Sequence, residues 1–217
     1  ALVVAAARPV AVIALPTDQQ TIILAMDVSI SMRAADVAPD RISASQVAAK
    51  RFAAELPRNI RIGVVAYGGT AQLVQPPTLS REDVATAIDR FQLQRGTAIG
   101  SGIVISLATI FPKGGIDLSQ VTGDRNLTPP LVGDTEPDRK EFKPVAPGSY
   151  GSAAIVLLTD GQNTSGPDPM TAAQMAADRG VKVFTVGFGT KDGDTIGFEG
   201  WSMRVRLDER TLQNIAN

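Results

Sequence analysis

The sequence contains no cysteine and no histidine among its 217 residues. These absences exclude disulfides, zinc sites built from thiolates or imidazoles, cysteine nucleophiles and the usual serine–histidine–aspartate triad. Neither sign of charge dominates, since 21 Lys and Arg face 22 Asp and Glu. Without a basic stretch, no nucleic acid is expected as a partner. Any metal or catalytic chemistry must therefore use oxygen donors.

Apolar residues make up 44% of the chain and gather in short runs that alternate with amphipathic stretches. The apolar runs predict strands at 21–26, 60–67, 153–159 and 181–186, with a further short strand at 71–74 that ends before Pro76. Helical spacing predicts helices at 41–56, 80–91, 99–111, 170–179 and 207–217. In the first of these, Val47 is expected on the apolar face. Strands that alternate with helices predict an α/β fold, a doubly wound, mostly parallel sheet with helices on both faces.

Residues 20–217 are expected to form a single domain after a lead-in at 1–19. The lead-in opens with the apolar run Ala1 to Ala7, which is either the end of a membrane helix or an ordinary strand. Both chain ends are expected to continue in a longer protein. Residues 113–152 hold five prolines among mixed charges, so we expect an insertion without regular structure there, at the amino ends of the strands.

Polar side chains follow two of the predicted strands. Asp27, Ser29 and Ser31 form the pattern D-x-S-x-S directly after the first strand, Asp160 follows another strand in Thr-Asp-Gly, and Thr97 precedes an apolar helix. Singly, the serines fit a helix N-cap and Asp160 an Asp-Gly turn. Together, their oxygens at the carboxyl ends of strands suit a hard divalent cation, Mg²⁺ first, with Mn²⁺ or Ca²⁺ as alternatives. We predict these five residues as metal ligands.

The same motifs resemble the metal-ion-dependent adhesion site of the von Willebrand factor type A (VWA) domain family. The match runs through AMDVSISM, QRGTAIG and LLTDGQNTSG and covers the chain from about Thr21 onward. The resemblance implies a doubly wound sheet with one antiparallel edge strand. Within the family, the chain is similar to bacterial membrane-anchored members of the aerotolerance (Bat) type, in which such a domain follows a membrane helix. That similarity favours the membrane alternative for the lead-in.

The predicted function is a protein-binding module without catalytic activity, whose metal recruits an Asp or Glu side chain from a partner. The resemblance implies a MoxR-type AAA+ ATPase or other membrane-anchored VWA proteins as partners, and a membrane-anchored protein with this domain on the extracytoplasmic side. The alternative is a Mg²⁺-dependent phosphoryl-transfer enzyme of the haloacid dehalogenase kind with Asp27 as nucleophile. That chemistry usually places an acidic residue two positions later, where this chain has Ser29.

Overall fold

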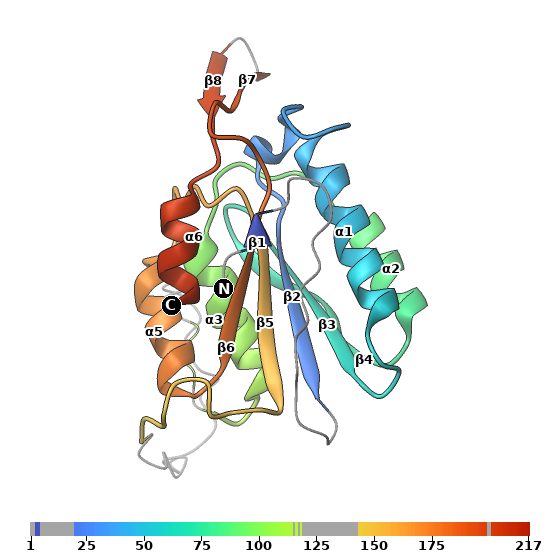
Figure 1. The fold of residues 1–217 in the computed structure, drawn as a ribbon, viewed down its shortest axis with the longest axis vertical. Helices are drawn as coiled ribbons and strands as arrows, with labels where there is room; N and C mark the ends of the chain where they lie inside the picture. The colour runs from blue at the N-terminus through green and yellow to red at the C-terminus, as the bar shows by residue number, and fades with distance from the viewer. Residues whose placement is uncertain (1–2, 5–19, 115, 117, 119–142, 199–200) are drawn as a thin grey trace, which may run out of the picture.

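The structure is a computed structural model that describes residues 3–4, 20–114, 116, 118, 143–198 and 201–217. Its centre is a six-stranded sheet in the order β1-β6-β5-β2-β3-β4, in which β4 runs antiparallel to β3 and the other pairs are parallel (Figure 1). The strands are β1 (Val3–Val4), β2 (Thr21–Asp27), β3 (Arg61–Tyr67), β4 (Ala71–Thr78), β5 (Ala153–Thr159) and β6 (Lys182–Gly187). This architecture confirms the predicted fold class.

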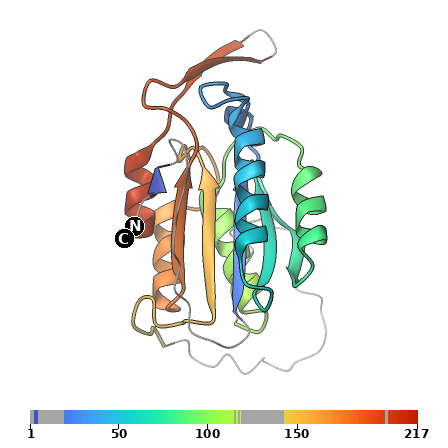
Figure 2. The ribbon, with the colours of Figure 1, turned by 45° about the vertical axis from the view of Figure 1, so that its right-hand side comes forward.

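Helices cover both faces of the sheet (Figure 2). One face carries α1 (Arg41–Glu55) and α2 (Arg81–Asp89), and the other carries α3 (Ile99–Ile110), α5 (Pro169–Asp178) and α6 (Glu209–Ala216). Successive side chains of β2 point to opposite faces of the sheet and so pack against different helices, because side chains alternate along a strand. Leu24 joins the core formed with α1 and α2, and Ala25 joins the core formed with α3, α5 and α6. The helix ranges agree with the sequence prediction to within a few residues.

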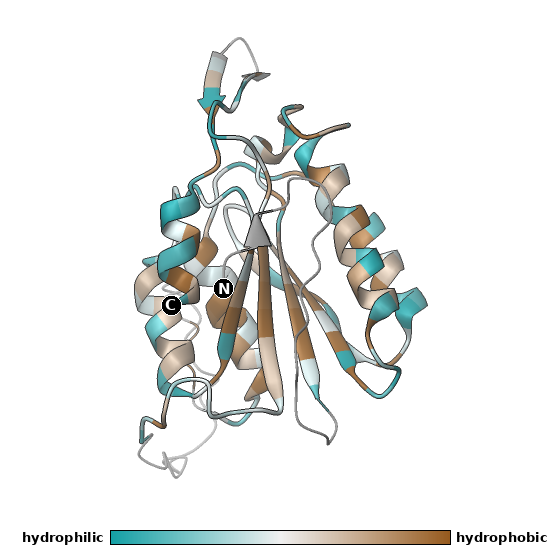
Figure 3. Cartoon of the chain, viewed as in Figure 1, coloured by the Kyte–Doolittle hydropathy of each residue, from teal (hydrophilic) through white to brown (hydrophobic). Residues whose placement is uncertain are grey.

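A parallel sheet that is covered on both faces needs strands that are apolar throughout. Every residue of β5 is buried, and so is every residue of β2 after Thr21. Figure 3 shows the apolar colouring gathered on the central strands and on the inner sides of the helices. The continuous apolar runs of the sequence therefore predicted these two strands correctly.

Two details of the prediction were wrong. The short strand expected to end before Pro76 continues to Thr78 as β4. Proline is tolerated there because β4 is an edge strand that pairs with β3 alone, and the pairing with β3 shifts register near this point. Val47, expected on the apolar face of α1, is 62% exposed, because the buried face of this helix is formed by small residues such as Ala49 and Ala53.

A hairpin that the sequence analysis did not predict lies between β6 and α6. Its strands, β7 (Asp194–Phe198) and β8 (Trp201–Val205), pair antiparallel and extend past the main sheet at the top of Figure 1. The base of the hairpin is fixed, because Ile196 and Val205 are buried with Ala34. The Ala35 N–H also donates to Asp194 Oδ2 over 2.9 Å. The hairpin therefore stands beside the loop that follows β2.

The lead-in and the proline-rich insertion fall largely outside the described residues. Val3–Val4 form β1 parallel to β6, as in the strand alternative for the lead-in. Residues 143–151, at the end of the insertion, lie in no helix or strand. They lie at the amino ends of the strands, as predicted, because the Tyr150 N–H donates to the Gly180 carbonyl over 2.9 Å just before β6 begins. Within the described part of the chain, no helix has the length and apolar character to span a membrane.

Candidate metal centre

The carboxyl ends of β2 and β5 lie side by side, because these strands pair in parallel. Asp27 is the last residue of β2, and Asp160 follows the last residue of β5. Ser31 lies in the short 3₁₀ helix η1 (Ile30–Arg33) that comes after β2. Ser29 and Gln94 form a parallel bridge, which ties this loop to the segment that leads to α3. The two motif loops therefore meet at one edge of the sheet.

The three predicted hydroxyl ligands are all buried at this edge. Ser29 Oγ lies 2.8 Å from Ser31 Oγ. The Ser29 side chain makes no capping hydrogen bond to η1, so the N-cap explanation fails for this residue. Thr97 is held by the loop that follows β5, because its carbonyl oxygen accepts the N–H groups of Thr164 at 2.9 Å and Ser165 at 3.1 Å.

Asp27 is a fully buried carboxylate with both oxygens engaged. Its Oδ1 accepts the Ser29 N–H at 2.8 Å, and its Oδ2 accepts the Thr159 hydroxyl at 2.5 Å. Burial, together with the neighbouring Asp160 carboxylate, raises the pKa of Asp27 to about 7 against these hydrogen bonds. Without a cation in the site, the folded protein therefore holds a proton on Asp27 near neutral pH more readily than an exposed aspartate would.

Asp160 is also fully buried, and protein donors reach both of its oxygens. Its Oδ1 accepts the Gln162 N–H at 3.1 Å, as an Asp-Gly turn requires, and its Oδ2 accepts Arg41 Nη1 at 3.0 Å. Burial raises the pKa of Asp160, while the Ser31 hydroxyl, the Gln162 N–H and the Arg41 guanidinium act in the opposite direction. The turn explanation for this residue is therefore correct and yet incomplete, since the carboxylate also faces Ser31 and Arg41.

Arg41 is the functional-site neighbour that the sequence reasoning missed. Its fully buried guanidinium contacts Asp160, donates from Nε and Nη2 to Asp36 at 2.7 Å each, and donates from Nη2 to the Val205 carbonyl at 3.2 Å. The hydrogen bonds from Arg41 lower the pKa of Asp36 to about 2. In the sequence, Arg41 opens an amphipathic helix after Asp40, and this local pattern carries no signal for contacts with residues so far along the chain.

The donor set at this edge fits a hard divalent cation. Two buried carboxylates whose pKa values are raised by burial gain from a nearby positive charge, and all the remaining donors are hydroxyl oxygens. Ser165 Oγ, beside Thr97, is buried without a hydrogen-bond partner and so has an unused donor and acceptor. Among the described residues, no three Asp, Glu, His or Cys side chains gather as a metal cluster.

Fold and site together define a class: doubly wound α/β domains that gather carboxylate and hydroxyl oxygens after a D-x-S-x-S motif at the carboxyl edge of the sheet. Models of the von Willebrand factor type A domain match residues 22–124 and 148–201, which together form most of the chain. The chain belongs to the von Willebrand factor type A domain family. The predicted family is thereby confirmed.

The chain is also similar to curated proteins and to solved structures. A UPF0353 protein of Mycolicibacterium gilvum (strain PYR-GCK) is 37% identical over 220 residues, which cover 99% of this chain and 57% of that protein. The chain thus spans a little over half the length of that curated relative. An aerotolerance-related membrane protein from Bacteroides fragilis NCTC 9343 superposes with a TM-score of 0.67 at 23% identity, over 91% of this chain and 86% of that one.

A second similar structure is proximal thread matrix protein 1 from the mussel byssus, described with a zinc-occupied MIDAS motif. It superposes with a TM-score of 0.53 at 21% identity, over 91% of this chain and 39% of that one. At these identities, the two solved structures establish a shared fold. What they bind or assemble with belongs to those proteins.

Proposed function

We propose that this domain is a metal-ion-dependent protein-binding module. Ser29, Ser31 and Thr97 would hold one divalent cation, most simply Mg²⁺, through their hydroxyl oxygens, with Asp27 and Asp160 acting directly or through water. The observation that carries the proposal is the juxtaposition of two fully buried carboxylates with the Ser29–Ser31 hydroxyl pair at one edge of the sheet. The zinc-occupied MIDAS motif of a protein with the same fold supports a divalent ion at this position.

The electrostatics of the site support an acidic ligand group. Each oxygen of Asp27 and Asp160 already accepts a hydrogen bond from the protein, so the hydroxyls are the donors best placed for direct contact with the ion. Neutral hydroxyls leave the ion its positive charge, since they supply none of their own. An Asp or Glu side chain from a protein partner completes such a coordination sphere, while a Lys or Arg side chain is repelled.

Catalysis is not part of the proposal, because Asp27 is poorly suited to act as a nucleophile. Its carboxylate has no exposed surface, and Ser29 and Thr159 occupy both of its oxygens. A raised pKa further lowers the fraction of the ionised form that could attack a phosphoryl group in the absence of a cation. A generic phosphatase assay with Mg²⁺ is expected to show no turnover, and turnover abolished by Asp27→Asn would overturn this part.

The cellular setting belongs to the same proposal. We infer a bacterial membrane-anchored protein, with the membrane segment outside the described residues and this domain on the extracytoplasmic side. Its expected partners are a MoxR-type AAA+ ATPase or other membrane-anchored VWA proteins. A pull-down from the source cells, with Mg²⁺ or with EDTA, tests this directly. A partner that binds equally well in EDTA contradicts the metal-dependent mode for that partner.

Isothermal titration calorimetry with Mg²⁺ tests the metal centre itself. We expect binding by the natural sequence and none by the double variant Asp27→Ala, Ser29→Ala. The matched control is Ser106→Ala, which removes a buried serine whose hydroxyl donates to the Gly102 carbonyl within α3. Identical Mg²⁺ binding by the natural sequence and the double variant would contradict the proposed metal centre. Circular dichroism checks that each variant is folded. We expect that it is, because a weakly bound Mg²⁺ ion stabilises the fold only by mass action and its loss need not unfold the protein.

A further inference from the structure

A cavity of about 590 Å³ opens beside the candidate metal centre. Its lining includes three basic side chains, Lys191, Arg204 and Arg206, and two acidic ones, Asp208 and Glu209. The basic residues come from the β7–β8 hairpin and its flanks, and the acidic ones from the start of α6. Three basic and two acidic side chains give this lining a net charge of +1, whereas the chain as a whole has a net charge of −1.

The acidic residues of the cavity wall are already engaged. Asp208 caps α6, because its carboxylate accepts the Thr211 N–H at 3.1 Å and the Thr211 hydroxyl at 2.8 Å. Glu209 forms an ion pair with Lys191 at 3.3 Å. Arg204 donates one N–H to the Asp192 carbonyl at 2.8 Å and, with five N–H groups on a guanidinium, keeps further donors. The positive charges of Arg204 and Arg206 therefore face the cavity without a carboxylate partner among the described residues.

The cavity and the metal centre share the loop that follows β5. The Gln162 N–H donates to Asp160 Oδ1 at 3.1 Å, while its side-chain Nε2 donates to the Arg206 carbonyl at 2.5 Å. The Asp208 N–H donates to the Asp160 carbonyl at 2.8 Å. One short segment thus presents a metal-facing carboxylate on one side and forms the cavity wall on the other.

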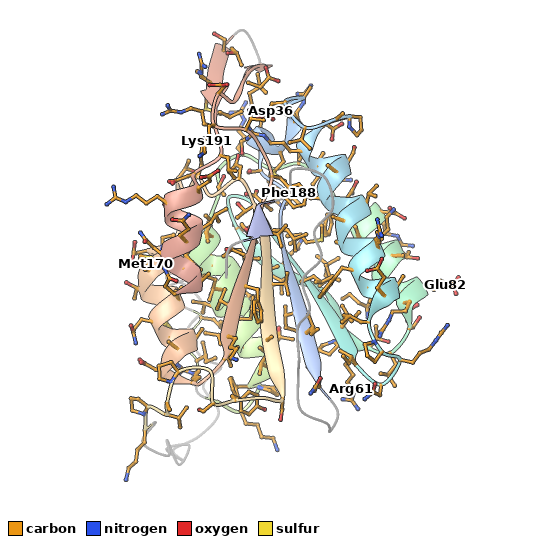
Figure 4. All side chains as sticks on the ribbon, viewed as in Figure 1. Asp36, Arg61, Glu82, Met170, Phe188 and Lys191 are labelled. Atoms are coloured by element: carbon orange, nitrogen blue, oxygen red, sulfur yellow. The ribbon has the colours of Figure 1, made fainter. Side chains whose placement is uncertain are left out.

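The opposite wall of the cavity is fixed to the metal centre as well. Asp36 accepts the Thr190 N–H at 2.8 Å and the Thr190 hydroxyl at 2.9 Å, and it also holds Arg41, which contacts Asp160. Lys191 directly follows Thr190, and Figure 4 shows Asp36 and Lys191 at the same end of the molecule, with Arg61 at the other end. The cavity is therefore held in a defined position relative to the site.

We propose that this cavity is a second acid-binding subsite, so that the partner segment presents two acidic side chains, one for the metal and one for Arg204 and Arg206. The inference rests on the proposed metal-dependent function and specifies the chemistry of the partner. A guanidinium binds a carboxylate through paired, charge-assisted hydrogen bonds, which gives this subsite directional specificity. Two linked contacts on one segment also bind more tightly than either alone.

Synthetic peptides test the two subsites separately. Fluorescein-labelled Gly-Ser peptides carry either one Glu or two Glu residues joined by spacers of increasing length, and fluorescence anisotropy reports their binding in saturating Mg²⁺ or in EDTA. At the best spacer, the two-Glu peptide is expected to bind about three- to tenfold more tightly than the one-Glu peptide. The double variant Arg204→Gln, Arg206→Gln removes this gain and leaves one-Glu binding unchanged. The matched control, Arg51→Gln with Arg58→Gln, lowers the net charge equally at exposed positions and keeps the gain.

The outcomes separate the two proposals. Mg²⁺-dependent binding of the one-Glu peptide, without a gain from the second Glu at any spacer, overturns the second subsite and leaves the metal-dependent function standing. A gain that survives Arg204→Gln, Arg206→Gln, or that the control removes equally, overturns it too. If neither peptide binds the unsubstituted protein more tightly in Mg²⁺ than in EDTA, the metal-dependent function itself is contradicted.

Discussion

Asp27 is the residue at which the stability of the fold and the proposed function oppose each other. Its carboxylate has no exposed surface and lies near a second buried carboxylate, Asp160. Removal of an ionised group from water is unfavourable unless a positive charge or several hydrogen bonds compensate for it. Two hydrogen bonds compensate here in part, and the pKa of Asp27 still rises to about 7. A divalent cation would supply the remaining compensation.

The raised pKa of Asp27 predicts how stability depends on pH in the absence of metal. Since the folded-state pKa lies above the ordinary value of 3.8, the folded chain keeps a proton that the unfolded chain loses, and stability falls as the pH rises from about 4 through 7. Between pH 5 and 8, this single group is expected to contribute a loss of about 2 kcal/mol. Urea unfolding in EDTA across that range measures the effect.

Asp27→Asn is the control for this prediction. Its amide does not titrate, so the fall in stability toward neutral pH should shrink while the pH dependence from other groups, such as Asp36, remains. Equal slopes for both proteins would show that Asp27 does not hold the proton. The affinity for Mg²⁺ should change in the opposite sense and rise as the pH passes through about 7, because proton and cation compete for the same carboxylate.

At the scale of elements, Arg41 joins segments that lie far apart in the sequence. From the first turn of α1, its guanidinium reaches the loop after β5, the loop after η1 and the end of β8. Gly189 allows the close approach of a fourth segment, since a Cβ at this residue, whose φ is +136°, would lie 2.9 Å from the guanidinium carbon. One buried cation therefore fixes the loops of the site relative to one another.

Arg41→Gln is expected to destabilise the fold by about 3–5 kcal/mol, because it leaves buried Asp160 and partly buried Asp36 without their cation. Denaturant unfolding measures the loss. Arg51→Gln on the same helix is the matched control, with a side chain that is 74% exposed and paired with Glu55, and it should leave stability unchanged. A loss for Arg41→Gln no larger than that of the control would mean that the buried network contributes little to the fold.

Most elements of the fold, unlike the contacts of Arg41, could be predicted from the sequence. Continuous apolar runs and helical spacing predicted the central strands and the helices, because burial on both faces of a parallel sheet leaves a strong local pattern. The site loops were predicted from D-x-S-x-S and T-D-G, since their residues follow strands directly. The contacts of Arg41 and the β7–β8 hairpin could not be predicted. The contacts depend on tertiary proximity, and among the hairpin side chains whose burial the structure describes only Ile196 and Val205 are buried.

At the scale of the whole molecule, the two ends of the sheet are chemically different. The carboxyl end holds the candidate metal centre, the basic cavity and the hairpin. The amino end holds the described residues of the proline-rich insertion, where Tyr150 contacts the Phe111 ring with centroids 5.0 Å apart. Binding at one end should therefore be separable from changes at the other.

Replacement of residues 119–142 by a short Gly-Ser linker tests this separation. The described residues on the two sides of this segment lie at the amino ends of the strands, so the variant should keep its circular dichroism spectrum and bind Mg²⁺ within about twofold of the natural sequence, as independent sites do. Calorimetry on the folded variant measures the affinity. A large loss of Mg²⁺ affinity in a protein that still folds would place this segment in contact with the metal centre.

Pro76 and Pro77 also govern how one copy of this molecule meets another. They lie on β4, whose outer side faces no further strand of the described sheet. Proline has no amide hydrogen and the N–H groups of successive strand residues point to opposite sides, so one of these two prolines removes a donor from the outer side, where a strand from a second molecule would pair. The missing donor weakens the pairing of β4 with a strand of another molecule, and thereby disfavours aggregation through this edge. Crowded copies would therefore meet there through their side chains and remain separate folded units.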